Sequence, residues 1–132
     1  MSDVPSTKPV AEKLGAGPGQ RWHVPAGDLA WLRAEVEARG AQVVSRRPSR
    51  ADAVVHRVRT LQDLDALTPL RSVIAPAGAV WVVWQKGRPA LKEDHVRAAA
   101  LAQGLVDVKV IRVSDTLSGL KLVIPVALRA GR

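Results

Sequence analysis

The stretch from Ala79 to Trp84 (Ala-Val-Trp-Val-Val-Trp) is apolar at every position. A strand with one face in water alternates apolar and polar residues, whereas a strand covered on both faces reads as a continuous apolar run. The run is as long as a strand and far shorter than the roughly 20 residues that cross a bilayer. The rest of the chain must therefore supply helices for both faces of the sheet that contains this strand.

The flanking segments alternate between strand and helix patterns. Further strands are predicted at residues 21–25, 41–45, 51–58, 106–113 and 120–126. Helices are predicted from an Asp28 N-cap to Gly40, from Thr60 to Pro69 and from Lys92 to Gln103, with a turn at Pro76–Gly78. The last two strands alternate and are joined by the short connection 114–119, which indicates an antiparallel hairpin. This order predicts a three-layer, Rossmann-like α/β fold with a mostly parallel sheet of about six strands that ends in the hairpin.

The chain has 132 residues and no cysteine. This length suits one domain, which we place at residues 10–132 after a flexible, proline-punctuated arm at 1–9. The lack of cysteine excludes thiolate nucleophiles, cysteine-ligated metals and disulfides, and it suits the cytoplasm. We expect no signal peptide and no membrane partner, because no basic stretch followed by an apolar run opens the chain.

The formal net charge of +8 favours an anionic partner, although 14 of the 20 basic residues are arginine, which is also typical of high-GC genomes. The densest basic loop holds Arg46, Arg47 and Arg50, and Lys86 follows the central strand. We take these four residues as candidate contacts to an anion or a partner. Nucleic acid is one such partner, but the lack of Phe and Tyr disfavours a base-stacking surface.

The run Leu14-Gly15-Ala16-Gly17-Pro18-Gly19 resembles the first motif of S-adenosylmethionine (SAM) methyltransferases. Such a loop needs a buried strand before it and a helix after it, since the helix N-terminus and close backbone approach create the cradle. Here polar residues precede the run and a strand follows it. We therefore interpret the run as a turn that leads into the first strand.

A cofactor loop in this fold belongs after the first strand, at 25–28, where the chain has one glycine and Asp28. The second strand ends at Ser45-Arg46-Arg47, where a carboxylate for ribose hydroxyls is typical. An arginine there suits a 2′-phosphate, so NADP remains an alternative, but we predict no cofactor.

The sequence supplies no catalytic or metal-binding constellation. His23, His56 and His95 are scattered, without the spacing that a metal site requires. Ser118-Gly119 lacks the pattern of a nucleophile elbow. We expect neither a catalytic nor a metal site.

Four segments in order carry a resemblance to a known family. They are Thr7–Gly15 with Pro18-Gly19, Pro76–Lys86, Gly104–Val110, and Val113 to Val123 with Thr116 and Ser118-Gly119-Leu120-Lys121. Together they resemble the bacterial family called domain of unknown function 3052, over about residues 6–123. Gln85 departs from the usual Trp-Pro-Lys, and Leu117 stands where a Trp is common. The resemblance implies a cytoplasmic bacterial protein and transfers no catalytic residue.

The element order is also similar to a class I methyltransferase core that lacks one βα unit, and fold-level similarity does not define a reaction. The leading hypothesis is a non-catalytic binding or regulatory module, with a protein or an anionic ligand as partner, at the carboxyl ends of the strands. The alternatives are an enzyme that binds SAM or NADP, and a protein that binds nucleic acid through its basic surface.

Overall fold

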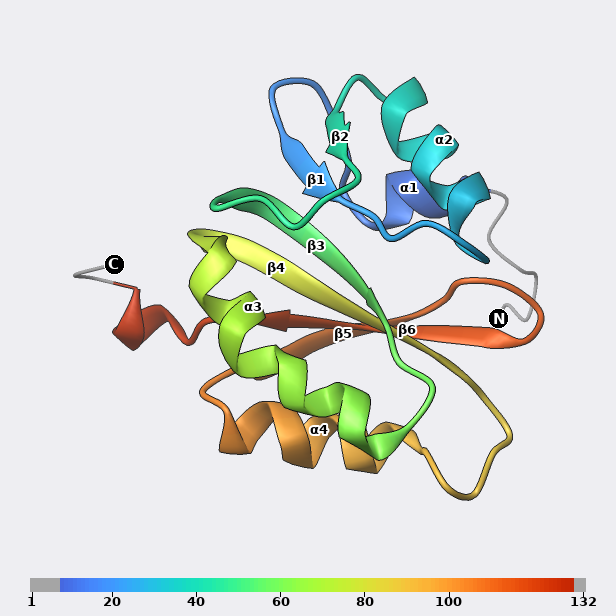
Figure 1. The fold of residues 1–132 in the computed structure, drawn as a ribbon, viewed down its shortest axis with the longest axis vertical. Helices are drawn as coiled ribbons and strands as arrows, with labels where there is room; N and C mark the ends of the chain where they lie inside the picture. Colours follow the sequence, from blue (N-terminus) through green and yellow to red (C-terminus); the bar gives the residue numbers. More distant parts are fainter. Residues whose placement is uncertain (1–7, 130–132) are drawn as a thin grey trace.

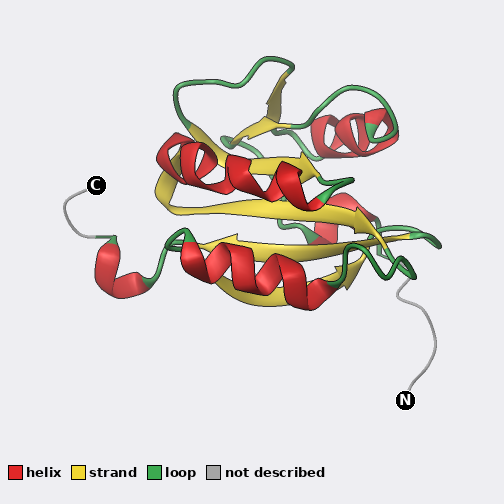
Figure 2. Ribbon diagram, turned by 60° about the horizontal axis from the view of Figure 1, so that its bottom comes forward, coloured by secondary structure: helices red, strands yellow, loops and turns green. Residues whose placement is uncertain are grey.

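The computed structural model describes residues 8–129, which form one sheet with helices on both faces (Figures 1 and 2). The strands are β1 Arg21–His23, β2 Gln42–Val44, β3 Ala51–Arg57, β4 Ile74–Gln85, β5 Val106–Arg112 and β6 Leu117–Val123. The helices are α1 Val10–Lys13, α2 Ala30–Ala38, α3 Leu67–Val73 and α4 Glu93–Ala102, with 3-10 helices η1 Leu61–Ala66 and η2 Val126–Leu128. Residues 1–7 of the predicted arm lie outside the described residues.

The strands lie in the order β2-β1-β3-β4-β6-β5. The first four strands in this order are parallel, and β6 is antiparallel to both β4 and β5. The predicted mostly parallel, Rossmann-like sheet with a terminal hairpin is confirmed. Because the chain moves outward from β1 to β2 and then returns to β3, the strand order reverses between β1 and β3, which is where such sheets place their ligand crevice.

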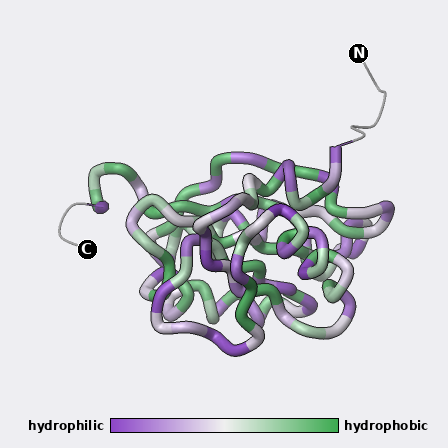
Figure 3. Tube along the Cα trace, turned by 90° about the horizontal axis from the view of Figure 1, so that it is seen from above, coloured by the Kyte–Doolittle hydropathy of each residue, from purple (hydrophilic) through white to green (hydrophobic). Residues whose placement is uncertain are grey.

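Strand β4 is buried on both faces, as its apolar run predicts. Trp81 and Val83 pack into the core under α1 and α2, whereas Val82 and Trp84 pack into the core under α3 and α4. Figure 3 shows hydrophilic stretches on the outer turns of the chain. The two tryptophans of this strand therefore anchor opposite layers of the molecule.

Four local predictions were wrong. The last strand, expected at 120–126 after a connection at 114–119, is β6 at Leu117–Val123, so the connection is shorter than predicted. The expected turn at Pro76–Gly78 lies inside β4, which begins at Ile74. The helix expected to end at Pro69 continues to Val73, since a proline in the first turn of α3 costs no helical hydrogen bond. Asp28 does not cap α2, whose N-cap is Leu29 without a side-chain hydrogen bond. By contrast, the capping box of Thr60 and Asp63 is confirmed, at the start of η1.

Gly78 allows a close approach between β4 and β3. A Cβ atom there would lie 2.6 Å from the Asp52 carbonyl oxygen and 3.0 Å from the Ala75 carbonyl oxygen. Backbone atoms cannot move aside as a flexible side chain would. The β3–β4 register at this point, which is irregular between Ala51 and Ala53, therefore depends on the missing side chain.

We predict that Gly78→Ala lowers the free energy of unfolding by about 1–3 kcal/mol, because the added methyl group overlaps backbone atoms. Urea denaturation measures the change. Gly17→Ala is the matched control, since nothing lies within 4 Å of its Cβ position, and it should stay within about 0.5 kcal/mol. Equal stability of the two variants would contradict the close approach.

Candidate functional site

The carboxyl ends of the parallel strands carry a small ion-pair cluster at the point where the strand order reverses. Asp28, in the turn after β1, accepts a hydrogen bond of 3.0 Å from Nε of Arg57, at the end of β3. Arg59 forms a second ion pair with the same carboxylate, at 3.1 Å. Arg57 also donates to the Val58 carbonyl oxygen, and its side chain is 10% exposed. Two guanidinium groups thus face one carboxylate, and the crevice keeps a net positive charge.

The arginines control the ionisation of Asp28. Burial opposes the charged form, but the hydrogen bond from Arg57 and the charges of Arg57 and Arg59 outweigh it, so the pKa of Asp28 lies below its usual value. Asp63 has a lowered pKa for a related reason, because the backbone N–H groups of Arg59 and Thr60 donate to its carboxylate. Both carboxylates therefore stay ionised at neutral pH and help to fix the loop after β3.

His56 lies beneath this loop. Burial lowers its pKa, and this outweighs the nearby carbonyl oxygen of Asp63, 2.7 Å from Nε2, which favours the charged form. The positive charge of Arg47 lowers the pKa of His56 further. A neutral imidazole that donates to a carbonyl oxygen is a structural group here, as the sequence predicts.

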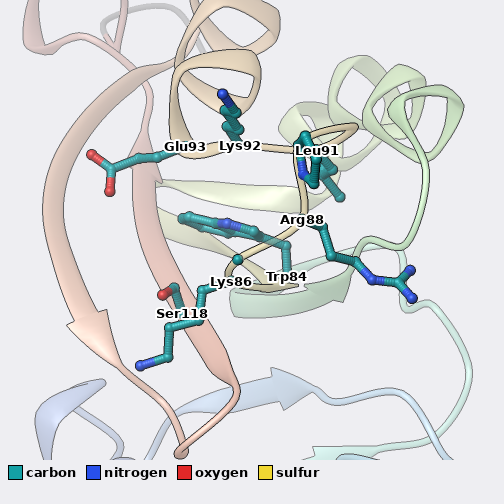
Figure 4. A pocket seen from close by; sticks show the side chains of 9 residues that line it. Trp84, Lys86, Arg88, Leu91, Lys92, Glu93 and Ser118 are labelled. Atoms are coloured by element: carbon teal, nitrogen blue, oxygen red, sulfur yellow. The ribbon is translucent and has the colours of Figure 1, made fainter.

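A cavity of about 430 Å³ lies beside the end of β4 (Figure 4). The indole of Trp84, 3% exposed in all, forms part of its lining together with Leu91. Polar residues complete the lining: Lys86, Arg88, Lys92, Glu93 and Ser118. Ser118 lies opposite Trp84 in the β4–β6 register. The cavity thus combines an apolar wall with a largely cationic rim.

The charges of this rim are unbalanced. Glu93 forms an ion pair with Arg97 on the same helix. Among the described residues 8–129, Lys86, Arg88 and Lys92 form no ion pair. All three residues are exposed, and unpaired cations gathered around one cavity favour an anion beside them. We name this cavity the Trp84 pocket, and its lining includes Trp84, Lys86, Arg88, Leu91, Lys92 and Ser118.

A second cavity, of about 190 Å³, joins the Trp84 pocket to the ion-pair cluster. Arg57, Arg59, Gln85 and Arg88 line it, and Arg88 and Leu91 are shared with the Trp84 pocket. In Figure 4 the guanidinium of Arg88 lies on the other side of Trp84 from Lys86 and Ser118. A basic surface therefore continues along the carboxyl ends of β3 and β4.

The structure separates the four residues predicted to contact an anion. Lys86 lines the Trp84 pocket at the carboxyl end of β4. Arg46 and Arg47 are exposed in the loop after β2. Arg50 lines a cavity with Arg21 and Ala75, near the amino ends of β1 and β4. The expectation that all four gather at the carboxyl edge is wrong for Arg50, because the loop runs back along the sheet to begin β3.

Sequence reasoning missed most of the Trp84 pocket. The sequence predicts Trp84 as core and singles out neither Arg88 nor Lys92, and it offers Ser118, in the expected hairpin connection, only as a weaker candidate contact than Lys86. The position of these residues in the sequence could have predicted the site, because residues 86–92 follow a strand predicted to be buried on both faces. That loop lies at the edge where open α/β sheets bind ligands. Only the structure brings Ser118 from β6 to the same cavity.

The glycine run forms the turn before β1 that the sequence predicts. Gly15 and Gly19 have φ values of +85° and +82°, which favour glycine. The Gln20 side chain holds the turn, because Oε1 accepts from the Gly17 N–H at 2.9 Å and Nε2 donates to the Gly15 carbonyl oxygen at 3.2 Å. The run lies upstream of β1, away from the loop that follows the strand's carboxyl end.

Residues 8–129 hold neither a metal-binding cluster nor a membrane-spanning helix. No group of three or more His, Asp or Glu side chains there is placed to hold a metal ion. In the same part of the chain no helix has the length and apolar character needed to cross a bilayer.

Several solved structures with a similar fold are methyltransferases. A ribosomal protein L11 methylase from Lactobacillus delbrueckii subsp. bulgaricus matches with a TM-score of 0.64 and 13% identity, over 85% of this chain and 73% of that one. A SAM-dependent methyltransferase from Bacteroides fragilis, solved with S-adenosyl-L-homocysteine, matches with a TM-score of 0.58 and 11% identity, over 89% and 78% of the two chains.

The mitomycin 7-O-methyltransferase matches with a TM-score of 0.63 and 13% identity, over 87% of this chain. The matched part is 52% of that enzyme, so this chain spans about half of its length. No family model and no curated protein sequence matches the chain. The fold is therefore the Rossmann-like fold of class I SAM-dependent methyltransferases, in a truncated form in which β2 leads to β3 with no helix between them.

We predict that Asp28→Asn lowers the free energy of unfolding by about 1 kcal/mol at neutral pH, since it leaves the poorly exposed Arg57 without its charged partner. The pKa of Asp28 is lowered by folding, so its stabilisation is present above the unfolded pKa of about 4 and is lost as the pH falls through the folded value. Urea denaturation at pH 7 and pH 3 measures both effects, and the difference between wild type and variant should be smaller at pH 3 than at pH 7.

Asp115→Asn is the control, because the Asp115 side chain in its ion pair with Arg112 is 90% exposed. Exposed pairs contribute little, so the change should be below about 0.5 kcal/mol. If Asp28→Asn lowers the free energy of unfolding at pH 7 no more than this control does, the stabilising role of the Asp28 carboxylate is contradicted.

Proposed function

We propose that this protein is a binding module that holds a small anion with an apolar body in the Trp84 pocket, without catalysing a reaction. The observation that carries the proposal is the unpaired cationic rim around a buried indole wall. Lys86, Arg88 and Lys92 supply positive charge, while Trp84 and Leu91 supply apolar surface. A cavity of about 430 Å³ suits a ligand of one or two rings or a short chain.

The position of the pocket supports the same proposal. Parallel α/β sheets bind ligands outside the carboxyl ends of their strands, and Trp84 and Lys86 lie at the carboxyl end of β4. The adjoining cavity, which Arg57 and Arg59 line, extends the basic surface toward the reversal of the strand order. A ligand with a second anionic group has room to reach it.

SAM binding is the second candidate, because the structural neighbours are SAM-dependent methyltransferases. The residues of this chain fit that cofactor poorly. The turn after β1 has a single glycine, Gly27, and its Asp28 carboxylate is paired with two arginines. Ser45 follows β2 where a carboxylate for the ribose hydroxyls is typical. SAM also carries a sulfonium and an ammonium group, and the net positive crevice opposes them.

Membership of the domain of unknown function 3052 family, with the bacterial and cytoplasmic setting it implies, belongs to the same proposal and rests on the four sequence segments. That family resemblance transfers no reaction. The resemblance therefore agrees with a binding module and does not identify the ligand.

We predict that 1-naphthoate, an aromatic carboxylate of suitable size, binds to the protein and that neutral 1-naphthamide binds at least about tenfold more weakly, which is about 1.4 kcal/mol. Isothermal titration calorimetry measures both ligands. Lys86→Ala and Lys92→Ala should each weaken naphthoate binding, and Lys109→Ala, an exposed lysine on β5 with the same change of charge, should not.

SAM is titrated in the same series. Tighter binding of SAM than of naphthoate, with no effect of Lys86→Ala, would favour the methyltransferase candidate over our proposal. Equal binding of naphthoate and naphthamide would show that the cationic rim does not select the ligand.

A further inference from the structure

A separate cavity lies under the glycine run, near the amino ends of β3 and β4 and away from the Trp84 pocket. Its volume is about 260 Å³. Gly15 and Gln20 line it from the run, Trp22 from β1, Trp81 from β4 and Lys121 from β6. No residue that lines it also lines the Trp84 pocket. This cavity therefore needs its own explanation.

The indole N–H of Trp81 is unsatisfied. Trp81 is 1% exposed, and its Nε1 is a buried side-chain atom without a hydrogen-bond partner in the described part of the chain. The Trp22 indole, which lines the same cavity, donates to Gln20 Oε1 at 2.8 Å. A buried, unpaired donor costs about 1–3 kcal/mol, and native proteins usually satisfy such groups with a water, an ion or a ligand.

A cation lies beside this donor. Lys121 is the register partner of Trp81 between β6 and β4, and its Nζ lies 6.0 Å from the centroid of the Trp81 ring. Lys121 forms no ion pair within residues 8–129. Trp81 and Lys121 line the same cavity, and a carboxylate that enters it satisfies both the N–H donor and the ammonium group once the N–H is uncovered.

The remaining lining limits the ligand. Leu14, Ala53 and Ala79 are buried and apolar, so they suit a short hydrocarbon body. Asp52 contributes a carboxylate, whose Oδ2 already accepts the Arg21 N–H at 2.7 Å. This negative charge disfavours a ligand with a second carboxylate.

We propose that this cavity is a second binding site, which holds a small monocarboxylate between the Trp81 indole N–H and the Lys121 ammonium group. The N–H is closed to solvent, so the ligand reaches it when a side chain of the wall moves. The Lys121 side chain can make this movement, because it lies over the ring and its stem is flexible. The inference does not depend on the proposed function of the Trp84 pocket.

The test follows the four tryptophan indole N–H signals of the full chain in ¹H–¹⁵N NMR spectra, assigned with Trp→Phe variants. Butyrate is the probe, and butyramide is its neutral counterpart. We expect the Trp81 signal to move with saturation in butyrate and to respond at least about tenfold more weakly to butyramide. Succinate should bind more weakly than butyrate, because of Asp52.

Lys121→Met should weaken butyrate binding at least about tenfold, whereas the matched control Lys109→Met leaves it unchanged. If Lys121→Met does not fold, Lys121→Gln keeps the polar stem and tests the same charge. A Trp81 signal that does not saturate, that responds equally to butyramide, or that responds equally in the lysine variant would overturn the proposal. Equal binding of succinate would overturn the limit to monocarboxylates. The Trp84 signal reports on the other pocket separately.

Discussion

The packing of β4 between two cores positions almost everything else in this molecule. Its side chains alternate between the layer of α1 and α2 and the layer of α3 and α4, so each layer depends on the same strand. Trp81 near the middle of the strand lines the cavity under the glycine run, and Trp84 near its end lines the pocket at the carboxyl edge. Both candidate sites are thus built on the large side chains that the buried strand needs for its own packing.

Charge distinguishes the carboxyl edge of this protein from a SAM site on the same fold. In the crevice where the strand order reverses, Arg57 and Arg59 share the single carboxylate of Asp28. The excess positive charge continues through Arg88 to Lys86. Electrostatic attraction along this edge favours anions and opposes a cationic cofactor. The shared fold therefore fixes where a ligand lies, and the local charge determines which ligand is favoured.

The architecture was accessible from the sequence because its signals are local. The continuous apolar run at Ala79–Trp84, the capping box at Thr60 and the alternation of the last strands each specify one element, and the right-handed connection rule arranges them. A local prediction failed where a residue from another element competes for the same side chain. Asp28 has the residue type of a helix cap, but Arg57 at the end of β3 and Arg59 in the loop after it form stronger, charge-assisted interactions with it.

The candidate sites were less accessible, because they depend on which distant segments meet. Ser118 reaches the Trp84 pocket through the β4–β6 register, and Lys121 reaches Trp81 in the same way. Arg50 does not lie at the carboxyl edge as predicted, because the loop after β2 returns to the amino end of the sheet. Nucleic-acid binding through the basic surface stays a prediction.

Native mass spectrometry of the protein purified from its own cells tests the central claim most directly. Our interpretation predicts a bound small molecule of anionic character, which is released when Lys86 and Lys92 are both replaced by alanine. A bound mass equal to that of SAM or S-adenosylhomocysteine, retained in this double variant, would contradict it.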